Sequence, residues 1–480
     1  MAGSTPFPDA TAATTLGNGS GGASAVGAVT ITSGGKAPTP GSAAAPSDLD
    51  PSAPPDGRRS ARRAVWAALV GSSLESFDFY VFAYFSALFA PAVFFPKQDP
   101  ASAVLSSLAI VAVSYVVRPL GAIVFGNLGD RIGRRRTLLV TITVMGVATG
   151  LIGVLPGYST IGLAAPVLLV LLRVIQGLSL GGEWSGGILV AVENAAPRRR
   201  ALWAALPQLG SPVGTTLVSI LTIVLARTLS AEDLAAWGWR IPFLLAFPLL
   251  LVSLWMRWRI DETPVFREIV AEDRRARIPV LSAFTRHPGA IVIAIGAALL
   301  GIGSYSLMNT YTLSYGVTQL GFDYATLSFA TLVGSLVQFV AIPLFGAWAD
   351  RSSSARIVAI GAAGTLIVAF PIYFALQYAS FGALVAMMVI GGLLPTLSWA
   401  GLGGLMADLF QGPIRYSALS IAYAVAATIS GFIPLLTGVL GQATSEAWWH
   451  PGVVLALISA ITLAASIVAA RMRVRQAAEG

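Results

Sequence analysis

The sequence contains no cysteine, only two histidines and few charged residues among its 480 positions. Without cysteine, the chain can have no disulfide bond and no thiolate metal site. Charged residues make up 11% of the chain and hydrophobic residues 55%, whereas soluble domains carry about 25% charged residues. The chain also shows no glycine-rich phosphate-binding loop, so ATP-driven transport has no support. This composition predicts an integral membrane protein.

The chain is rich in long uncharged stretches, which predict twelve transmembrane helices. A spanning helix needs about 20 apolar residues. Two stretches, Thr137–Leu172 and Ile357–Ala407, are long enough for two helices each, with a turn at Pro156–Tyr158 in the first and near Gln377 in the second. The expected spans are 64–90, 104–128, 137–156, 163–193, 201–226, 239–260, 289–315, 323–347, 357–377, 381–408, 416–440 and 451–470.

The basic residues indicate how these helices are oriented. The net charge is +8, but most Lys and Arg residues lie in alternate loops or next to the chain ends, which a nucleic-acid-binding surface would not require. Basic loops stay in the cytoplasm. We therefore expect a multi-pass protein of the cytoplasmic (inner) membrane with both termini in the cytoplasm. It would contact the lipid bilayer and no nucleic acid. The main clusters are Arg58–Arg63, Arg131–Arg136, Arg198–Arg200 and Arg257–Arg286.

A repeated motif divides the chain into two halves. The motif Gly-x-x-x-Asp-Arg at 126–131 returns at 346–351, at the end of the corresponding helix. Two six-helix halves place a substrate site near the middle of the membrane, between them. Residues 1–57 carry few large apolar side chains, so we expect a disordered tail there. The expected parts are that tail, a first bundle at 58–260, a linker with a short helix at 261–288, a second bundle at 289–470 and a tail at 471–480.

Charged residues interrupt the apolar stretches of the first half. A charge in hydrocarbon is costly, so such residues mark a path for an ion or polar solute. Arg118 and Glu75 are expected at similar depth, near the membrane centre, where they can meet if their helices face each other. The alternative is a fixed pair that only holds two helices together. The five residues are Glu75, Asp78, Arg118, Arg173 and Glu183.

These charges favour a transporter of small organic anions. A guanidinium binds a carboxylate through two hydrogen bonds, so Arg118 is the expected substrate anchor. Glu75, Asp78 or Glu183 would carry a proton, since both histidines lie at loop edges. Asp78, three positions after Glu75 on the same helix face, could instead only accept hydrogen bonds from neighbouring hydroxyls.

The remaining substrate contacts must come from neutral side chains, because the second half carries no charge within its apolar stretches. Gln208 lies at an expected helix kink beside Pro207. From the second half we expect contributions from polar and aromatic residues, each of which could instead serve packing or the membrane interface. They are Tyr305, Asn309 and Trp399.

Both copies of the repeated motif place charges at the cytoplasmic ends of helices, where they can form a gate. A charge cluster there would close the cytoplasmic side and break when the halves rock. The alternative is a plain topology signal. The expected gate residues are Gly126, Asp130, Arg131, Arg134, Arg135, Glu193, Asp350 and Arg351.

Several motifs resemble the major facilitator superfamily, and within it the metabolite:proton symporters. The similarity runs from about residue 64 to 470 and includes Leu74-Glu75-Ser76-Phe77-Asp78-Phe79, Arg118-Pro119-Leu120-Gly121, Arg173-Val174-Ile175-Gln176-Gly177, Gly181-Gly182-Glu183-Trp184, Pro207-Gln208-Leu209-Gly210 and Trp237-Gly238-Trp239-Arg240-Ile241-Pro242-Phe243. The chain departs from the family at Ser76-Phe77, where an aromatic pair is usual, and at Ser352–Ser354, where glycine and arginines are expected.

The resemblance implies an all-α fold of two six-helix bundles and no enzymatic activity. It implies import of a small carboxylate with protons by alternating access, with no cofactor besides the proton and a monomeric carrier. It also associates Arg173 with proton coupling, although this residue could instead extend to the interface. The alternatives are a zwitterion symporter of the betaine or proline type and a receptor of the same fold that does not transport.

Overall fold

The computed structural model describes residues 55–132, 134–180, 183–193, 195–258, 288–410 and 415–479. All described helices belong to one compact unit, Pro46–Gly480. The expected disordered tail and cytoplasmic linker lie, except for 55–57 and 288, outside the described residues.

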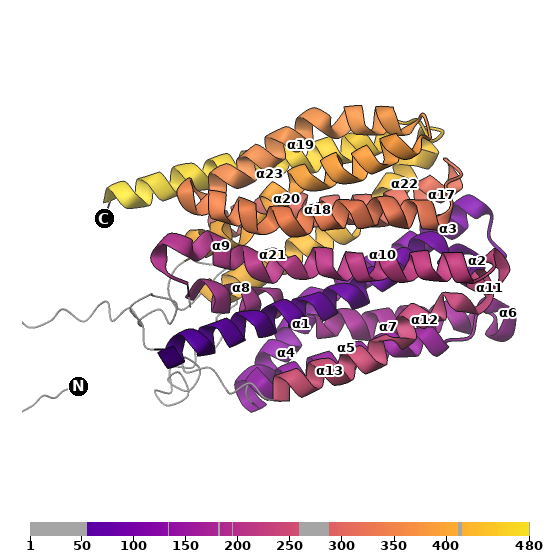
Figure 1. Ribbon diagram of the computed structural model, residues 1–480, viewed down its shortest axis with the longest axis horizontal. Helices are drawn as coiled ribbons and strands as arrows, with labels where there is room; N and C mark the ends of the chain where they lie inside the picture. Colours follow the sequence, from indigo (N-terminus) through magenta and orange to yellow (C-terminus); the bar gives the residue numbers. More distant parts are fainter. Residues whose placement is uncertain are drawn as a thin grey trace, which may run out of the picture. The chain divides into compact units, whose positions relative to one another are not determined.

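Helices of the first half cross the bundle six times (Figure 1). A single helix makes the first and third crossings, and consecutive helices make the others. They are α1 (Pro55–Leu88), α3 and α4 (Pro100–Val116, Arg118–Ile132), α5 (Arg134–Val154), α7 and α8 (Ala164–Ser179, Glu183–Glu193), α9, η2 and α10 (Arg200–Ala205, Leu206–Leu209, Gly210–Thr228), and η3, α12 and α13 (Leu234–Gly238, Arg240–Leu244, Ala246–Trp258). The short elements α2 (Ala90–Phe94), α6 (Tyr158–Ile161), η1 (Pro197–Arg199) and α11 (Ala231–Asp233) lie between crossings.

The second half repeats this arrangement. Its helices are α16, η4 and α17 (Pro288–Ser306, Leu307–Tyr311, Thr312–Thr318), α18 (Tyr324–Arg351), α19 (Ser354–Leu376), α20 (Phe381–Leu409), α21 and α22 (Arg415–Gly431, Ile433–Ala443), and α23 (His450–Glu479). Ten of the described stretches are long and apolar enough to cross a membrane, and α1 and α5 complete the twelve expected crossings. The prediction of twelve spans is therefore confirmed.

Both ends of the described chain lie at one end of the bundle, where α1 begins and α23 ends (Figure 1). We call this the terminal end, and the opposite end, where α1 stops at Leu88 and α23 starts at His450, the distal end. Helix α23 continues to Glu479, through the segment expected to be a tail. That segment contains no proline, and glycine occurs only at its last position, so nothing in it interrupts the helix.

Proline causes one of the interruptions that shape the interior. Pro119 has no N–H to donate to the carbonyl of Tyr115, one turn earlier, and the helix breaks between α3 and α4 at Val117. The hydroxyl of Thr428, on α21 of the second half, donates to this carbonyl at 2.9 Å. The break therefore places Arg118 at the start of a new helix and provides a contact between the halves.

Two glycines of the motifs allow α7 to pack closely against α3 and α4. A Cβ on Gly121 would lie 2.0 Å from the carbonyl oxygen of Leu178, and one on Gly177 would lie 2.2 Å from that of Ser114. Real Cβ atoms do not approach so closely, so no larger residue fits without moving a helix. This packing fixes the depth of the two intramembrane arginines relative to each other.

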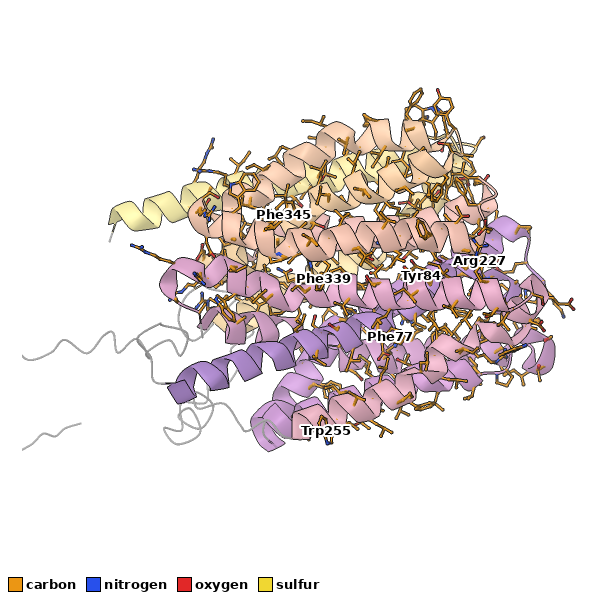
Figure 2. The ribbon with its side chains drawn as sticks, viewed as in Figure 1. Phe77, Tyr84, Arg227, Trp255, Phe339 and Phe345 are labelled. Carbon is orange, nitrogen blue, oxygen red and sulfur yellow. The ribbon has the colours of Figure 1, made fainter. Side chains whose placement is uncertain are left out.

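Apolar side chains cover both the interior and the outer surface, as a bilayer environment requires. Phe77 and Tyr84 of α1 are buried within the bundle, whereas Trp255 of α13 lies on its surface with 56% of the side chain exposed (Figure 2). Ile367 and Leu163 are 75% and 72% exposed. These exposed residues face the lipid, consistent with an integral membrane protein.

Candidate functional site

A cavity of about 110 Å³ lies between the two halves. One water needs about 10–15 Å³ of such space, so the cavity has room for a small solute. The first half contributes residues of α1, α3, α4, α8, η2 and α10, and the second half residues of α16, η4, α18, α20 and α21. Five expected substrate-binding residues line it: Arg118, Gln208, Tyr305, Asn309 and Trp399.

Arg118 is 7% exposed and begins α4 at the break in the second span. Its guanidinium carbon lies 4.5 Å from the ring centre of Tyr115 and 5.4 Å from that of Phe79. Cation–π contacts of this kind hold a guanidinium in place and leave its N–H groups available for hydrogen bonds. The Nε atom of Arg118 is buried without a hydrogen-bond partner. The arginine is therefore oriented and has a donor to offer.

Glu75 of α1 lines the same cavity as Arg118. The expectation that these two charges share one space is confirmed, and neither faces the lipid. The surrounding lining residues of α1 are Ser72, Ser76, Phe79 and Tyr80. They recur at intervals of three and four residues, so one face of the helix forms this wall of the cavity.

Aromatic rings from both halves meet at the cavity. Trp184 of α8 stacks on Tyr423 of α21, with ring centres 4.0 Å apart and planes at 6°. Tyr80 of α1 stacks on Tyr305 of α16 at 4.2 Å and 27°. Each pair joins one half to the other, so relative motion of the halves must separate these rings.

Three buried polar atoms that belong to lining residues have no hydrogen-bond partner among the described residues. They are Arg118 Nε, Trp184 Nε1 and Gln208 Oε1, which are two donors and one acceptor. An unpartnered buried polar atom costs about 1–3 kcal/mol and calls for an explanation. A ligand with an acceptor group and a donor group would satisfy all three.

The neighbours of these atoms fix their positions. Pro212 cannot donate to the carbonyl of Gln208 four residues earlier, and Trp399 Nε1 donates to this oxygen at 3.5 Å. The segment Leu206–Leu209 is a 3₁₀ turn, so the regular α-helix is interrupted at the position where a kink is expected. Asn309 Nδ2 donates to the carbonyl of Tyr305 at 3.4 Å.

Trp184, Tyr80 and Tyr115 were not among the expected site residues. Tyr80 could have been found, because it follows Glu75 by five positions and Ser76 by four, on the same helix face. Trp184 follows the expected Glu183 directly. No feature of the sequence pointed to Tyr115, because its position at the cavity depends on the helix break at Val117.

Asp78 does not line the cavity, and the expectation that it shares the face of Glu75 is wrong. The cavity face of α1 is centred on Ser76 and Phe79, and Asp78 lies well to one side of it. Its carboxyl faces the Thr149 hydroxyl of α5 and is 7% exposed. This corresponds to the alternative in which Asp78 accepts from a hydroxyl.

Asp78 belongs to a second polar cluster inside the first half. Gln176 Nε2 donates to Thr149 at 2.6 Å, and Arg173 donates to Gln176 Oε1 at 2.5 Å and to Ser114 at 2.5 Å. Arg173 is 1% exposed, and its guanidinium lies 3.8 Å from the ring centre of Phe82. Arg173 therefore does not extend to the interface, which overturns that alternative.

The side chains of several expected residues lie outside the described part of the structure. The structure gives only their backbone, which belongs to α4, α5 and α8. They are Glu183 of the expected coupling set and Gly126, Asp130, Arg131, Arg134, Arg135 and Glu193 of the expected gate.

Asp350, the second-half gate residue, joins the halves at the terminal end. Its carboxylate accepts from the backbone N–H groups of Ala201 at 2.8 Å and Leu202 at 3.2 Å, at the start of α9. A carboxylate at this position satisfies free N–H groups and complements the helix dipole. Arg351, beside it, is exposed to solvent.

The halves also meet at the distal end. The ring centres of Phe89 and Tyr324 lie 5.0 Å apart, and the Tyr324 hydroxyl lies 3.5 Å from the carbonyl oxygen of Leu88. Since the halves touch at both ends, the cavity lies between two closures.

Comparisons with known proteins agree with this arrangement. Residues 64–281 match the family model described as sugar (and other) transporter, and 293–479 match the Major Facilitator Superfamily model. The chain is 34% identical to the inner membrane metabolite transport protein YhjE of Escherichia coli K12 (84% of this chain, 92% of the relative). It is 34% identical to the shikimate transporter of the same strain (84% and 93%) and 31% identical to the proline/betaine transporter of Salmonella typhimurium LT2 (85% and 83%).

The fold is similar to that of a D-xylose–proton symporter crystal structure, with a TM-score of 0.65 and 20% identity over 84% of this chain and 97% of that one. At this identity the likeness concerns the fold alone, and it agrees with twelve helices in two bundles. These relatives are membrane transporters and not enzymes. The chain belongs to the major facilitator superfamily, among its metabolite:proton symporters.

Proposed function

We propose that the chain is a secondary active transporter that imports a small carboxylate-bearing metabolite together with protons by alternating access. The observation that carries the proposal is the set of unpartnered atoms at the cavity, Arg118 Nε, Trp184 Nε1 and Gln208 Oε1. Two of them are donors, one from the fixed guanidinium itself and one from the Trp184 indole, which suits a carboxylate. The transporter would lie in the inner membrane as a monomer, with the terminal end in the cytoplasm.

The third atom narrows the substrate class. Gln208 Oε1 accepts a hydrogen bond but cannot donate one. A solute that carries a hydroxyl or N–H group besides its carboxylate would satisfy it, whereas a trimethylammonium group would leave it unpartnered. A site built to bind a donor discriminates strongly against analogues that lack it, because its own polar group is then left buried and unpaired.

The cluster of Asp78, Thr149, Gln176 and Arg173 supports proton coupling. Its arginine donates to Gln176 and Ser114, and the buried carboxyl of Asp78 meets Thr149. A carboxyl in such surroundings exchanges its proton when a guanidinium moves toward it or away. We assign the coupling role to Asp78 and Arg173. Glu75, which faces the cavity, would act on the solute or carry a second proton.

A zwitterion symporter is the second candidate, and the cavity provides one observation in its favour. Glu75 and several aromatic rings line the cavity together with Arg118. Aromatic faces and a carboxylate suit a quaternary ammonium group. The acceptor at Gln208 argues for the first candidate.

Counterflow in proteoliposomes tests the proposal. We would load vesicles in turn with a hydroxycarboxylate, the matching carboxylate without a hydroxyl, and a trimethylammonium carboxylate. Faster exchange of the hydroxycarboxylate supports the proposal, while preference for the trimethylammonium compound supports the zwitterion symporter. Exchange of none of the three would contradict both. A protonophore should abolish accumulation but not counterflow.

A further inference from the structure

A second group of titratable side chains lies at the distal end of the second half, away from the cavity. His450 begins α23 and is fully buried, with 0% of its surface exposed. The sequence places it at a loop edge, where it would be expected to be solvated, so this burial was not anticipated. Tyr311 of η4 and Glu446 of the loop between α22 and α23 lie against it.

The hydrogen bonds of His450 identify its tautomer. Nδ1 lies 2.5 Å from the carbonyl oxygen of Ala447. A carbonyl can only accept, so Nδ1 carries the hydrogen. Nε2 lies 2.5 Å from the Tyr311 hydroxyl and 4.0 Å from Glu446 Oε2. In the neutral ring Nε2 therefore accepts from Tyr311, and it is also the atom at which a proton would be added.

We propose that His450, Glu446 and Tyr311 form a proton-binding site that controls the distal closure between the halves, separately from Asp78 and Arg173. Addition of a proton at Nε2 converts this atom from an acceptor into a donor. The imidazolium Nε2–H then donates to the Glu446 carboxylate, which is a stronger acceptor for a cation than the neutral Tyr311 hydroxyl oxygen, and the Tyr311 hydroxyl loses the acceptor for its own hydrogen. The tyrosine is released from α23.

The other groups around His450 are compatible with this exchange. From α17, the ring of Tyr315 packs edge-on at 5.9 Å, and from α19, Tyr373 meets Thr312 beside η4. Glu446 is the charged side chain that faces His450 among the described residues. Burial raises the pKa of Glu446 and lowers the pKa of His450, so the two groups titrate closer together. His450 lies at the N-terminus of α23, where the helix dipole is positive and disfavours an imidazolium. The Glu446 carboxylate is therefore needed to stabilise the protonated ring.

Tyr311 connects this site to the cavity and to the first half. It is the last residue of the π-turn Leu307–Tyr311, whose Met308 and Asn309 line the cavity. A Cβ on Gly438 of α22 would lie 3.0 Å from Leu105 of the first half and 3.8 Å from the Tyr311 ring. Tyr311 therefore packs where α22 meets α3, and its release would loosen the distal contact between the halves.

The loop backbone is also held in an unusual conformation. Ser445 and Glu446 have φ values of 53° and 55°, in the left-handed region that residues with side chains seldom adopt. The N–H of Glu446 donates to the carbonyl of Gly441 at 2.7 Å, which keeps the carboxyl close to the histidine. Backbone strain of this kind persists where the surrounding structure imposes it, often at functional sites.

Cysteine labelling tests the site directly, because the chain has no native cysteine. Leu88→Cys places a thiol at the distal contact, where Leu88 is 7% exposed, and Ala101→Cys, at an exposed position, corrects for the pH dependence of the thiol reaction. Without substrate, the corrected labelling rate of full-length protein in liposomes should rise about threefold or more from about pH 8 to about pH 5.5.

Three variants decide the outcome. His450→Gln keeps an acceptor for Tyr311 but does not titrate, so labelling should stay low at every pH, whereas His287→Gln, which removes the other histidine, should behave like the parent. Glu446→Gln should move the midpoint to lower pH, because the imidazolium loses its carboxylate. A rise that persists in His450→Gln overturns the proposal, and so does an unmoved midpoint in Glu446→Gln. The assay uses no substrate, so its result is independent of whether the carrier transports carboxylates.

Discussion

The two halves share an architecture but differ in what they place inside the membrane. The first half holds Glu75, Asp78, Arg118 and Arg173 in its interior, whereas the apolar stretches of the second contain no charged residue. The second half contributes aromatic rings and Asn309 to the cavity lining, and both ends of α18 contact the first half. If the proposed function holds, we expect the first half to bind the charged groups of the solute and the proton, and the second half to complete the cavity wall.

The polar interior of the first half is itself divided. Arg118 and Glu75 face the cavity between the halves, while Asp78 and Arg173 lie in a cluster among α1, α3, α5 and α7. Two separate sites can respond to two different ligands, a solute and a proton. Tyr115 lies between them, with its ring against Arg118 and its carbonyl bound by Thr428 of the second half.

Replacing the cavity arginine should have the largest effect on transport, and it tests whether the first half binds the charge of the solute. Arg118→Ala should reduce uptake by about 100-fold or more, because loss of a buried charged hydrogen-bonding partner costs about 2–5 kcal/mol. Uptake into proteoliposomes at equal protein content measures it. Arg118→Lys keeps the charge without the planar fork and should recover only part of the activity. Normal uptake by Arg118→Ala would show that the charge does not bind the solute.

Replacing the clustered carboxyl should separate the two sites. Asp78→Asn should abolish pH-driven accumulation while counterflow stays within about twofold of the parent, because the amide keeps the contact with Thr149 but cannot release a proton. The matched variant Glu75→Gln lies on the cavity wall and should instead change counterflow. Accumulation that survives Asp78→Asn and is lost in Glu75→Gln would assign coupling to the cavity.

Removing the buried acceptor should alter selectivity more than rate. Gln208→Leu should raise the KM for a hydroxycarboxylate about tenfold and leave the KM for the analogue without a hydroxyl nearly unchanged, since one neutral hydrogen bond is worth about 0.5–1.5 kcal/mol. Competition between the two solutes measures the ratio. Equal losses for both would mean that Gln208 supports the structure of the kink and not the choice of solute.

Weakening the terminal closure should have the smallest effect. Asp350→Asn keeps one acceptor oxygen for the N–H groups of Ala201 and Leu202 in place of two, and it removes the charge, which at a helix start is worth about 0.3–1 kcal/mol. We expect turnover to change about two- to fivefold with little change in solute affinity. Asp323→Asn removes a comparable charge that caps α18 within one half and serves as the control. Equal effects of the two variants would argue against a gate at Asp350.

The sequence was sufficient for the number of spans and for the depth of the charged residues along their helices. Uncharged stretches of sufficient length gave all twelve spans, because a bilayer accepts no other arrangement of such segments. The position of Arg118 and Glu75 in the interior of the bundle, away from lipid, followed from the cost of a charge in lipid. The kink at Gln208 followed from the neighbouring prolines.

The residues whose positions were predicted wrongly or missed depend on how each helix is rotated about its own axis. Asp78 was placed with Glu75 from their spacing, but the cavity face of α1 runs through Ser76 and Phe79. His450 was placed at a loop edge, because the sequence shows its neighbours along the chain but not the Tyr311 hydroxyl at its Nε2 atom.

The sequence by itself determined that the chain spans a membrane twelve times, in two related halves, with charge confined to the interior of the first. The tertiary structure alone decided which of those charges share a cavity, because rotation of a helix by one residue moves a side chain by 100°. It also decided that a histidine near the end of the chain is buried against Tyr311, since that contact joins α23 to a π-turn 139 residues earlier.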